Sequence, residues 1–512
     1  MRKKIALLFL ALAPIVVSAQ ETKNHNLEVA KNLDIFNQLY KNLDLMYVDT
    51  LDANKVIGTG IRAMLKSLDP YTEYFSEQKE LKTFISGKYG GIGALIRYHL
   101  AQKTAVIDEP YAGTPAQEAG LKKGDVILSI DDSLMTGKDT KYVSERLRGD
   151  AGTTFVLKIR RPSTGKELKL KITRRQIQYT PTIPYSGMRE NGVGYISLSQ
   201  FTEGCAQEVR RAFVDLRNQG MRSLVLDLRG NGGGSEMEAV NLVNMFVPRG
   251  MTVVSNKGKI REVSHDYKTT MEPLDTVMPL VVLVNDESAS ASEITSGALQ
   301  DLKRAKIIGT RTYGKGLVQV PIDLPYNTNV KITTSRYYLP SGRCIQGTGI
   351  EPDITVKQDT LPNIAYYLAG SGVDSTEVTF DYVVDYISKH PTIASPSEFH
   401  ISDADFADFK QRVIDSGFTY DPVSKKQLKE LVKTAKFEGY YDNARMAFEQ
   451  LEDKLKHDVA KEIDRHAAVL RQMLESEIIA AYYYQAGVLE AGLHYDKQLH
   501  EALRVLGEAS KQ

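Results

Sequence analysis

The chain has 512 residues, of which 25% are charged, and its formal net charge at pH 7 is +1. A chain of this length exceeds a single hydrophobic core, so we expect several domains. Because no basic stripe dominates the sequence, a protein dedicated to nucleic-acid binding is excluded.

The N-terminus has the three parts of a secretory signal peptide. A basic start, Arg2 to Lys4, precedes an apolar run over residues 5–17 and small residues up to Ala19. This order is typical of a cleaved leader, and the apolar run is too short to span a bilayer comfortably. We therefore expect residues 1–19 to be a signal peptide and the mature protein to be exported, to the periplasm or another extracytoplasmic compartment. An uncleaved leader that keeps the protein at the membrane is the alternative.

Residues 20–82 are expected to form an N-terminal helical region. Apolar residues recur every three or four positions from Leu27 to Leu43, which is the pattern of a helix with one apolar face. A second helix fits residues 57–68 and ends before Pro70, since proline cannot continue a helix.

Residues 83–177 are expected to form a small β-rich domain. β-prone runs alternate there with Gly and Asp turns, and one short helix fits residues 115–119. The β-prone runs lie at residues 104–108, 126–131 and 154–160.

Residues 178–360 alternate apolar, β-prone runs with amphipathic runs. The pattern predicts strands at residues 194–199, 223–228, 280–285 and 306–309, and helices at residues 205–219, 236–246 and 290–302. Such alternation indicates a layered α/β core with a largely buried sheet.

Residues 361–512 are expected to be a mostly helical C-terminal extension. A one-faced apolar stripe from Leu451 to Ile478 predicts one long helix. This helix would pack within its own domain or against a second subunit, so a homo-oligomer formed through helical termini is left open.

The most informative segment is Ser-Ala-Ser-Ala-Ser-Glu-Ile at residues 288–294. A predicted buried strand precedes it, and a predicted helix begins near Ser290. The N–H groups and the positive dipole end of such a helix would stabilise an oxyanion formed when Ser290 attacks a carbonyl. The alternative is that Ser288, Ser290 and Ser292 are only helix caps, and the segment taken alone favours that alternative.

A serine at pH 7 is a poor nucleophile unless a neighbouring base removes its proton. Between residues 100 and 389 the only histidine is His265, in a polar stretch, so a Ser-His-Asp triad is disfavoured. No metal-ligand motif such as H-E-x-x-H is present. Lys315 lies in a glycine-flanked turn 25 residues after Ser290. It is the best candidate base, provided that burial or neighbours depress its pKa.

A glycine cluster follows another predicted strand at residues 227–235, Asp-Leu-Arg-Gly-Asn-Gly-Gly-Gly-Ser. Gly233 or Gly234 could donate one backbone N–H to the oxyanion, and Ala291 could donate the other. The alternative is an ordinary tight turn. The glycine spacing does not fit a dinucleotide loop, and residues 309–316 lack the final Ser or Thr of a phosphate-binding loop.

These segments resemble the carboxy-terminal processing peptidases, also called tail-specific proteases. The resemblance covers about residues 30–360 in the domain order of that family. The matching segments are residues 67–72, 89–93, 113–116, 121–127, 194–196, 227–231, 288–294, 314–316 and 349–353.

The resemblance implies an α/β multidomain protein: a ClpP/crotonase-like protease core with an inserted PDZ domain. It implies that Ser290 is the nucleophile of a Ser-Lys dyad and Lys315 its general base. Gln319 looks like the residue that orients the lysine, and Glu293 like a supporting hydrogen-bonding residue. The oxyanion donors would be Ala291 and Gly234, with Gly233 as the alternative to Gly234. No metal or organic cofactor is needed.

The expected PDZ domain also has a physical basis for binding a protein tail. Backbone N–H groups of a glycine-rich turn can bind a terminal carboxylate, and a peptide can add as a strand beside the turn. Apolar side chains nearby would favour an apolar tail. A β-rich domain that serves only as a spacer is the alternative. The residues expected to bind the tail are Gly90, Gly91, Ile92, Gly93 and Leu95.

The sequence thus predicts an exported serine endopeptidase that recognises exposed apolar C-termini of protein substrates and cuts through an acyl-enzyme. The alternative is a non-catalytic PDZ adaptor or scaffold on a protease-like core. No nucleic-acid partner is expected, and a regulatory adaptor protein is left open. Cys205 and Cys344 are the only cysteines, too few for a disulfide scaffold, and their pairing is left open.

Overall fold

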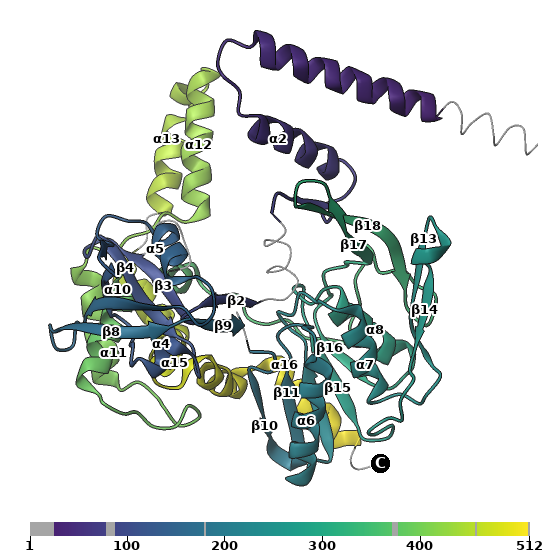
Figure 1. The fold of residues 1–512 in the computed structure, drawn as a ribbon. Coiled ribbons are helices and arrows are strands. Elements are labelled where there is room, and N and C mark those ends of the chain that lie inside the picture. The colour runs from purple at the N-terminus through teal and green to yellow at the C-terminus, as the bar shows by residue number, and fades with distance from the viewer. Residues whose placement is uncertain (1–24, 78–87, 179–180, 371–376, 456–457, 510–512) are drawn as a thin grey trace, which may run out of the picture. The chain divides into compact units, whose positions relative to one another are not determined.

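The computed structural model describes residues 25–77, 88–178, 181–370, 377–455 and 458–509 (Figure 1). The chain divides into two compact units. The smaller unit is Met1–Gln78 with Gln319–Thr333, and the larger unit is Lys79–Val318 with Thr334–Gln512. The predicted signal peptide, residues 1–19, lies outside the described residues. Within those residues, no helix combines the length and apolar character needed to cross a membrane.

The smaller unit begins with two helices, at residues 25–46 and at α2 (Ala53–Lys66). The second helix starts four residues before the predicted start because Asp52 caps it, accepting from the backbone N–H of Lys55 at 3.1 Å. The apolar face of the first helix is exposed, as at Leu33 and Leu39. The expected homo-oligomer through helical termini stays a prediction.

A short sheet completes the smaller unit. β1 (Glu73–Phe75) pairs antiparallel with the first part of β18 (Thr328–Tyr338). β17 (Leu317–Leu324) also pairs with β18. Tyr326 and Asn327 between them both have positive φ, as the favoured two-residue hairpin turns require.

The first part of the larger unit is an antiparallel β domain with the strand order β3-β4-β5-β7-β8, and β6 pairs with β5. Its centre is a cluster of fully buried aliphatic side chains that includes Ile107, Ile127 and Leu157. β3 is an edge strand of this sheet in the part of the chain that the structure describes. The elements are β2 (Lys88–Gly91), β3 (Ala94–His99), β4 (Thr104–Pro110), α4 (Pro115–Glu118), β5 (Val126–Ile130), β6 (Ser133–Leu134), α5 (Thr140–Leu147), β7 (Thr154–Arg160), β8 (Glu167–Thr173) and β9 (Arg175–Gln178), which pairs with β2.

The second part of the larger unit is an α/β layer structure with the strand order β10-β11-β12-β15-β16-β19. β10 is antiparallel and the others are parallel. Every residue of β12 and β15 is buried, because helices cover both faces of the sheet (Figure 1). The elements are β10 (Tyr185–Met188), β11 (Val193–Ser197), α6 (Cys205–Asn218), β12 (Ser223–Asp227), α7 (Glu236–Asn244), β13 (Thr252–Gly258), β14 (His265–Lys268), β15 (Leu280–Val284), α8 (Ala291–Asp301), β16 (Lys306–Gly309) and β19 (Ile354–Thr355).

The third part of the larger unit is helical, and here the sequence-based prediction of one helix over residues 451–478 is wrong. The structure has three helices where one was expected. Asp458 starts a new helix by accepting from the N–H groups of Ala460 and Lys461, and His466 is not helical. The elements are α9 (Asn363–Leu368), α10 (Val378–Lys389), α11 (Asp403–Asp415), α12 (Val423–Phe437), α13 (Tyr441–Lys454), α14 (Val459–Arg465), α15 (Ala467–Gly492) and α16 (Lys497–Ala509).

The helical part contacts both other parts of the larger unit. Toward the β domain, His99 at the end of β3 lies 2.9 Å from Asp381 of α10, and Gln485 of α15 donates to Glu109 at 2.7 Å. Toward the α/β part, α16 covers one face of the sheet. Cys205 and Cys344 are both free thiols in the structure.

Candidate active site

Ser290 lies between the buried strand β15 and the buried helix α8, where the chain turns sharply. Its φ of 57° and ψ of −113° lie in a region that residues with a side chain seldom adopt, at a cost of about 1–3 kcal/mol. Strained strand-to-helix turns of this kind present the nucleophilic serine in the α/β-hydrolases. The conformation therefore indicates a functional constraint on Ser290.

The structure separates Ser290 from the two other serines of its segment. Ser288 and Ser292 are fully buried. The Ser288 hydroxyl donates to the carbonyl of Leu228, and the Ser292 hydroxyl donates to the carbonyl of Asn231, both at 2.8 Å. Ser290 is only half-buried. The two neighbours therefore attach the segment to the glycine loop, and Ser290 is the serine that a substrate can reach.

Glu293 joins the backbone at Ser290 to the backbone at Lys315. Its fully buried carboxylate accepts from the N–H groups of Ser290 and Lys315, each at 2.8 Å. It also accepts from the Gly314 N–H at 2.7 Å and from the Thr312 hydroxyl at 2.5 Å. We call these five residues the Glu293 cluster. Burial raises the pKa of Glu293. The hydrogen bonds that its carboxylate accepts oppose this rise, and the one from Thr312 does so most strongly.

Tyr337 of β18 is a site residue that sequence reasoning missed. Its buried phenol donates to the carbonyl of Lys315 and is also hydrogen-bonded to the Ser290 side chain. Burial raises the pKa of Tyr337 well above its ordinary value, and the Glu293 carboxylate raises it further. The phenol is therefore neutral. In the sequence Tyr337 is one aromatic residue in a β-prone run, and no local signal sets it apart.

The glycine loop after β12 packs directly against the segment around Ser290. A Cβ atom on Gly233 would lie 2.7 Å from the Ser290 Cβ and 3.0 Å from the Ala291 nitrogen. The N–H of Gly233 donates to the Asn231 side chain at 2.9 Å. Among the described residues, no backbone carbonyl accepts from Gly234 or from Ala291. The two candidate glycines thus differ, because only Gly234 keeps its N–H available.

Gln319 lies on β17 in the smaller unit. Its side-chain amide donates to the hydroxyl of Thr333 at 3.1 Å. The Thr333 hydroxyl in turn lies 3.2 Å from that of Thr72, which Asp69 holds by accepting from it at 2.9 Å. This chain connects Gln319 to the segment at residues 67–72, and the role of Gln319 toward Lys315 stays a prediction.

The expected tail-binding residues divide between the core and the surface of the β domain. Gly93 has a φ of 75°, and a Cβ atom there would lie 2.5 Å from Thr114, so only glycine fits. Ile92 is buried in the core of the domain. Its side chain therefore packs in the core, and its role toward a tail stays a prediction. Leu95 is 47% exposed on the edge strand β3, where an apolar tail could reach it.

Comparison with known proteins gives three family matches in chain order. They are a PDZ domain at residues 106–161, peptidase family S41 at residues 192–356, and the model described as "Probable PDZ-protease, C-terminal helical domain" at residues 364–506.

Two curated relatives and one solved structure extend these matches. The chain is 36% identical over 360 residues to the Carboxy-terminal-processing protease of Bartonella bacilliformis, covering 69% of this chain and 82% of the relative. It is 32% identical over 351 residues to the protein named "Probable CtpA-like serine protease" in Staphylococcus epidermidis, covering 67% and 69%. The photosystem II D1 C-terminal processing protease is 32% identical, with 64% and 88% covered and a TM-score of 0.38. This chain belongs to the carboxy-terminal processing peptidases, the serine peptidases of family S41, and carries their PDZ domain and a C-terminal helical domain.

Proposed function

We propose that this peptidase is exported and that it cuts protein substrates with a dyad of Ser290 and Lys315. The observation that carries the proposal is the Glu293 carboxylate, which accepts from the backbone of both residues at the same distance, 2.8 Å. One buried acceptor thus fixes the nucleophile segment and the lysine turn to each other. A preorganised pair of this kind is what an activated serine needs.

In the proposed reaction, the Ser290 oxygen bonds to the peptide carbonyl carbon while the neutral Lys315 amine accepts the hydroxyl proton. The C–N bond of the tetrahedral intermediate then breaks, and the proton passes to the leaving amine. Water adds to the acyl-enzyme, again with Lys315 as the base, and releases the acid and free Ser290. These steps need only groups that the chain and water supply.

We assign the two oxyanion donors to the N–H groups of Gly234 and Ala291. Ala291 is the first residue of α8, so its N–H has no partner within the helix and lies at the positive end of the helix dipole. The hydrogen bond from Gly233 to Asn231 favours Gly234 over Gly233. Donors fixed before the reaction stabilise the developing charge without reorganisation.

Recognition of an apolar C-terminal tail is proposed for the edge strand β3. A peptide can add to a free strand edge through main-chain hydrogen bonds. Leu95 and Tyr98 expose apolar surface on this strand, which suits an apolar tail. Export rests on the leader-like residues 1–19.

The test is incubation of an extracytoplasmic extract with wild-type protein, Ser290→Ala or Lys315→Ala, followed by sequencing of new C-termini. Wild type should generate new C-termini, and both variants should generate none. Lys306→Ala, which changes an exposed lysine, is the matched control and should behave as wild type. Turnover retained in either dyad variant would overturn the assignment. Wild type that binds a tailed substrate without cutting it would support the adaptor alternative.

A further inference from the structure

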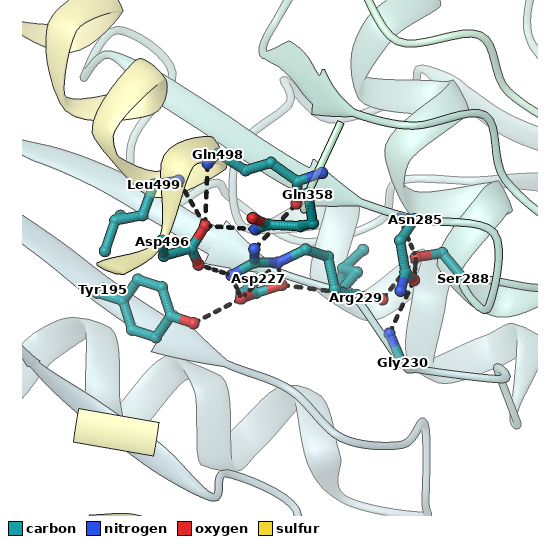
Figure 2. A network of polar contacts seen from close by, with 11 residues as sticks. Tyr195, Asp227, Arg229, Gly230, Asn285, Ser288, Gln358, Asp496, Gln498 and Leu499 are labelled. Atoms are coloured by element: carbon teal, nitrogen blue, oxygen red, sulfur yellow. Dashed lines mark hydrogen bonds and ion pairs between the residues drawn. The ribbon is translucent and has the colours of Figure 1, made fainter. Parts of the chain in front are cut away.

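The glycine loop is attached to the last helix of the chain through Arg229 (Figure 2). The Arg229 guanidinium donates to Asp227 at the end of β12 through Nε at 2.9 Å. The same guanidinium donates to Asp496 at 2.5 Å and to Gln498 at 2.9 Å. Tyr195 donates to Asp227 at 2.5 Å. We call these five residues the Arg229 network.

Charge and burial hold the Arg229 guanidinium in one orientation. The side chains of Arg229, Asp227 and Asp496 are 16%, 7% and 9% exposed. Burial alone would raise the pKa of Asp496, but the hydrogen bond and charge of Arg229 lower it below its ordinary value. Asp496 is therefore ionised at neutral pH. A planar guanidinium that is held by two carboxylates has little freedom to rotate.

Asp496 has a separate role for each of its carboxylate oxygens. Oδ1 accepts from the backbone N–H groups of Gln498 and Leu499, at 3.0 and 3.1 Å, and so caps α16. Oδ2 accepts from Arg229. The body of α16 is held independently, since Leu499, Ala502 and Leu506 pack against β12 and β15 in one apolar cluster. The position of α16 on the sheet thus determines where Arg229 is held.

The loop that follows Arg229 needs such an attachment. Gly230, Gly233 and Gly234 have φ values of 69°, 99° and 143°, and a loop rich in glycine has many accessible conformations. At its start the Gly230 N–H donates to the Asn285 side chain at 2.9 Å (Figure 2). Arg229 is the residue just before, so the two contacts together fix the beginning of the loop.

We propose that Asp496 and Gln498 are positioning residues for catalysis. Docking of α16 sets the oxyanion loop through Arg229, so these two residues at the start of the last helix position the loop for catalysis. The inference rests on the proposed function, in which Gly234 of this loop donates to the oxyanion. An open cavity of about 1060 Å³ adjoins Arg229 and Asp496.

The test uses the full chain with Asp496→Asn, because asparagine still caps a helix but removes the charge that Arg229 meets. The kcat for a tailed peptide should fall about 10- to 100-fold, less than the loss of a whole oxyanion donor, while KM changes less than about twofold. Gln498→Ala should give a smaller fall. Lys497 lies on the same turn of α16 as Gln498, and its side chain forms an exposed ion pair with Asp359. Lys497→Ala removes only this ion pair and should leave kcat unchanged.

A peptide aldehyde supplies a readout that a purely structural role would not move. Its adduct with Ser290 carries the oxyanion, so its affinity should fall in Asp496→Asn by the same factor as kcat/KM. Wild-type kcat and aldehyde affinity in Asp496→Asn would overturn the proposal. A fall in melting temperature with kcat and KM changed together would overturn it as well. Failure of the Ser-Lys assignment itself is distinguishable, because wild-type enzyme would then bind no aldehyde at Ser290.

Discussion

The Glu293 cluster and the Arg229 network hold two neighbouring backbone segments next to Ser290 by opposite electrostatics. In the Glu293 cluster a buried carboxylate accepts from uncharged donors, and burial raises its pKa. In the Arg229 network a buried cation meets two carboxylates, and the pKa of Asp496 is lowered. Each hydrogen bond of the first joins residues at most 22 positions apart, whereas Arg229 of the second bonds Asp496, which lies 267 positions away. Part of the active site thus belongs to a local motif, and part depends on where the end of the chain docks.

The largest effect is expected for Glu293→Ala. It leaves three backbone N–H groups and the Thr312 hydroxyl without their acceptor, and each buried donor left unpaired costs about 1–3 kcal/mol. We expect the free energy of unfolding to fall by more than about 3 kcal/mol and kcat/KM to fall more than about 100-fold. Urea unfolding and peptide cleavage measure the two.

Glu293→Gln is the matched control, because it keeps one acceptor oxygen at the same position. It should lose less stability than Glu293→Ala. Equal stability of Glu293→Ala and wild type would show that the cluster does not hold the two segments.

A double-mutant cycle on Arg229→Ala and Asp496→Asn tests whether the two ends of the Arg229 network are coupled. Arg229→Ala leaves two buried carboxylates without their cation, so the free energy of unfolding should fall by about 3–5 kcal/mol. Once Arg229 is absent, removing the charge of Asp496 should relieve repulsion. The effects should therefore be non-additive, with a coupling energy of about 1–3 kcal/mol. Strict additivity in urea unfolding would contradict a shared network.

Tyr337→Phe probes the hydroxyl that lies between Ser290 and Lys315. It removes the hydrogen bonds to the Lys315 carbonyl and to the Ser290 side chain while keeping the packing of the ring. We expect a loss of about 1 kcal/mol in stability and a fall in kcat of about tenfold or less. Tyr338→Phe, the neighbouring tyrosine, should leave kcat unchanged in the same steady-state assay. A Tyr337→Phe enzyme with wild-type kcat would remove Tyr337 from the site.

The smallest effect concerns the contact between the PDZ domain and the helical domain. The pKa of His99 is raised above 6.5, chiefly by its hydrogen bond to Asp381. Burial lowers this pKa, the charges of Asp381 and Glu377 raise it, and the charge of Arg97 lowers it. The stability that protonated His99 contributes is complete below about pH 6.5 and is lost as pH rises through the raised pKa.

Thermal unfolding across that pH range measures this contribution. Wild type should exceed His99→Gln in melting temperature most clearly below about pH 6.5, and the difference should shrink as the pH rises through the raised pKa. His500→Gln, at an exposed histidine, should show no such trend. A difference that grows with pH would contradict the assignment.

The sequence predicted the elements around the site well, because their signals are local. The strand before Ser290 was expected at residues 280–285 and the helix at 290–302, and the structure has them at Leu280–Val284 and Ala291–Asp301. An apolar run and a serine cap can each be recognised from a few neighbouring residues in the sequence. The prediction of a single helix over residues 451–478 is wrong because Asp458 caps a new helix there, although the apolar stripe continues.

The parts of the site that the sequence could not predict depend on long-range packing. Tyr337 reaches Lys315 only because β18 passes beside the lysine turn. Asp496 reaches Arg229 only because α16 docks on the sheet. Gly233 and Gly234 look alike in sequence, and a side-chain contact from Asn231 distinguishes them. None of these contacts leaves a periodic or compositional trace.

Trapping the acyl-enzyme shows whether Ser290 is the nucleophile and Lys315 its base. Wild-type enzyme turning over a peptide ester with an apolar C-terminal tail is quenched in acid, digested and mapped by mass spectrometry. We predict an acyl group on Ser290 in wild type, and none in Ser290→Ala or Lys315→Ala. An acyl group on another residue, or turnover by Ser290→Ala at the wild-type rate, would show that Ser290 is not the nucleophile.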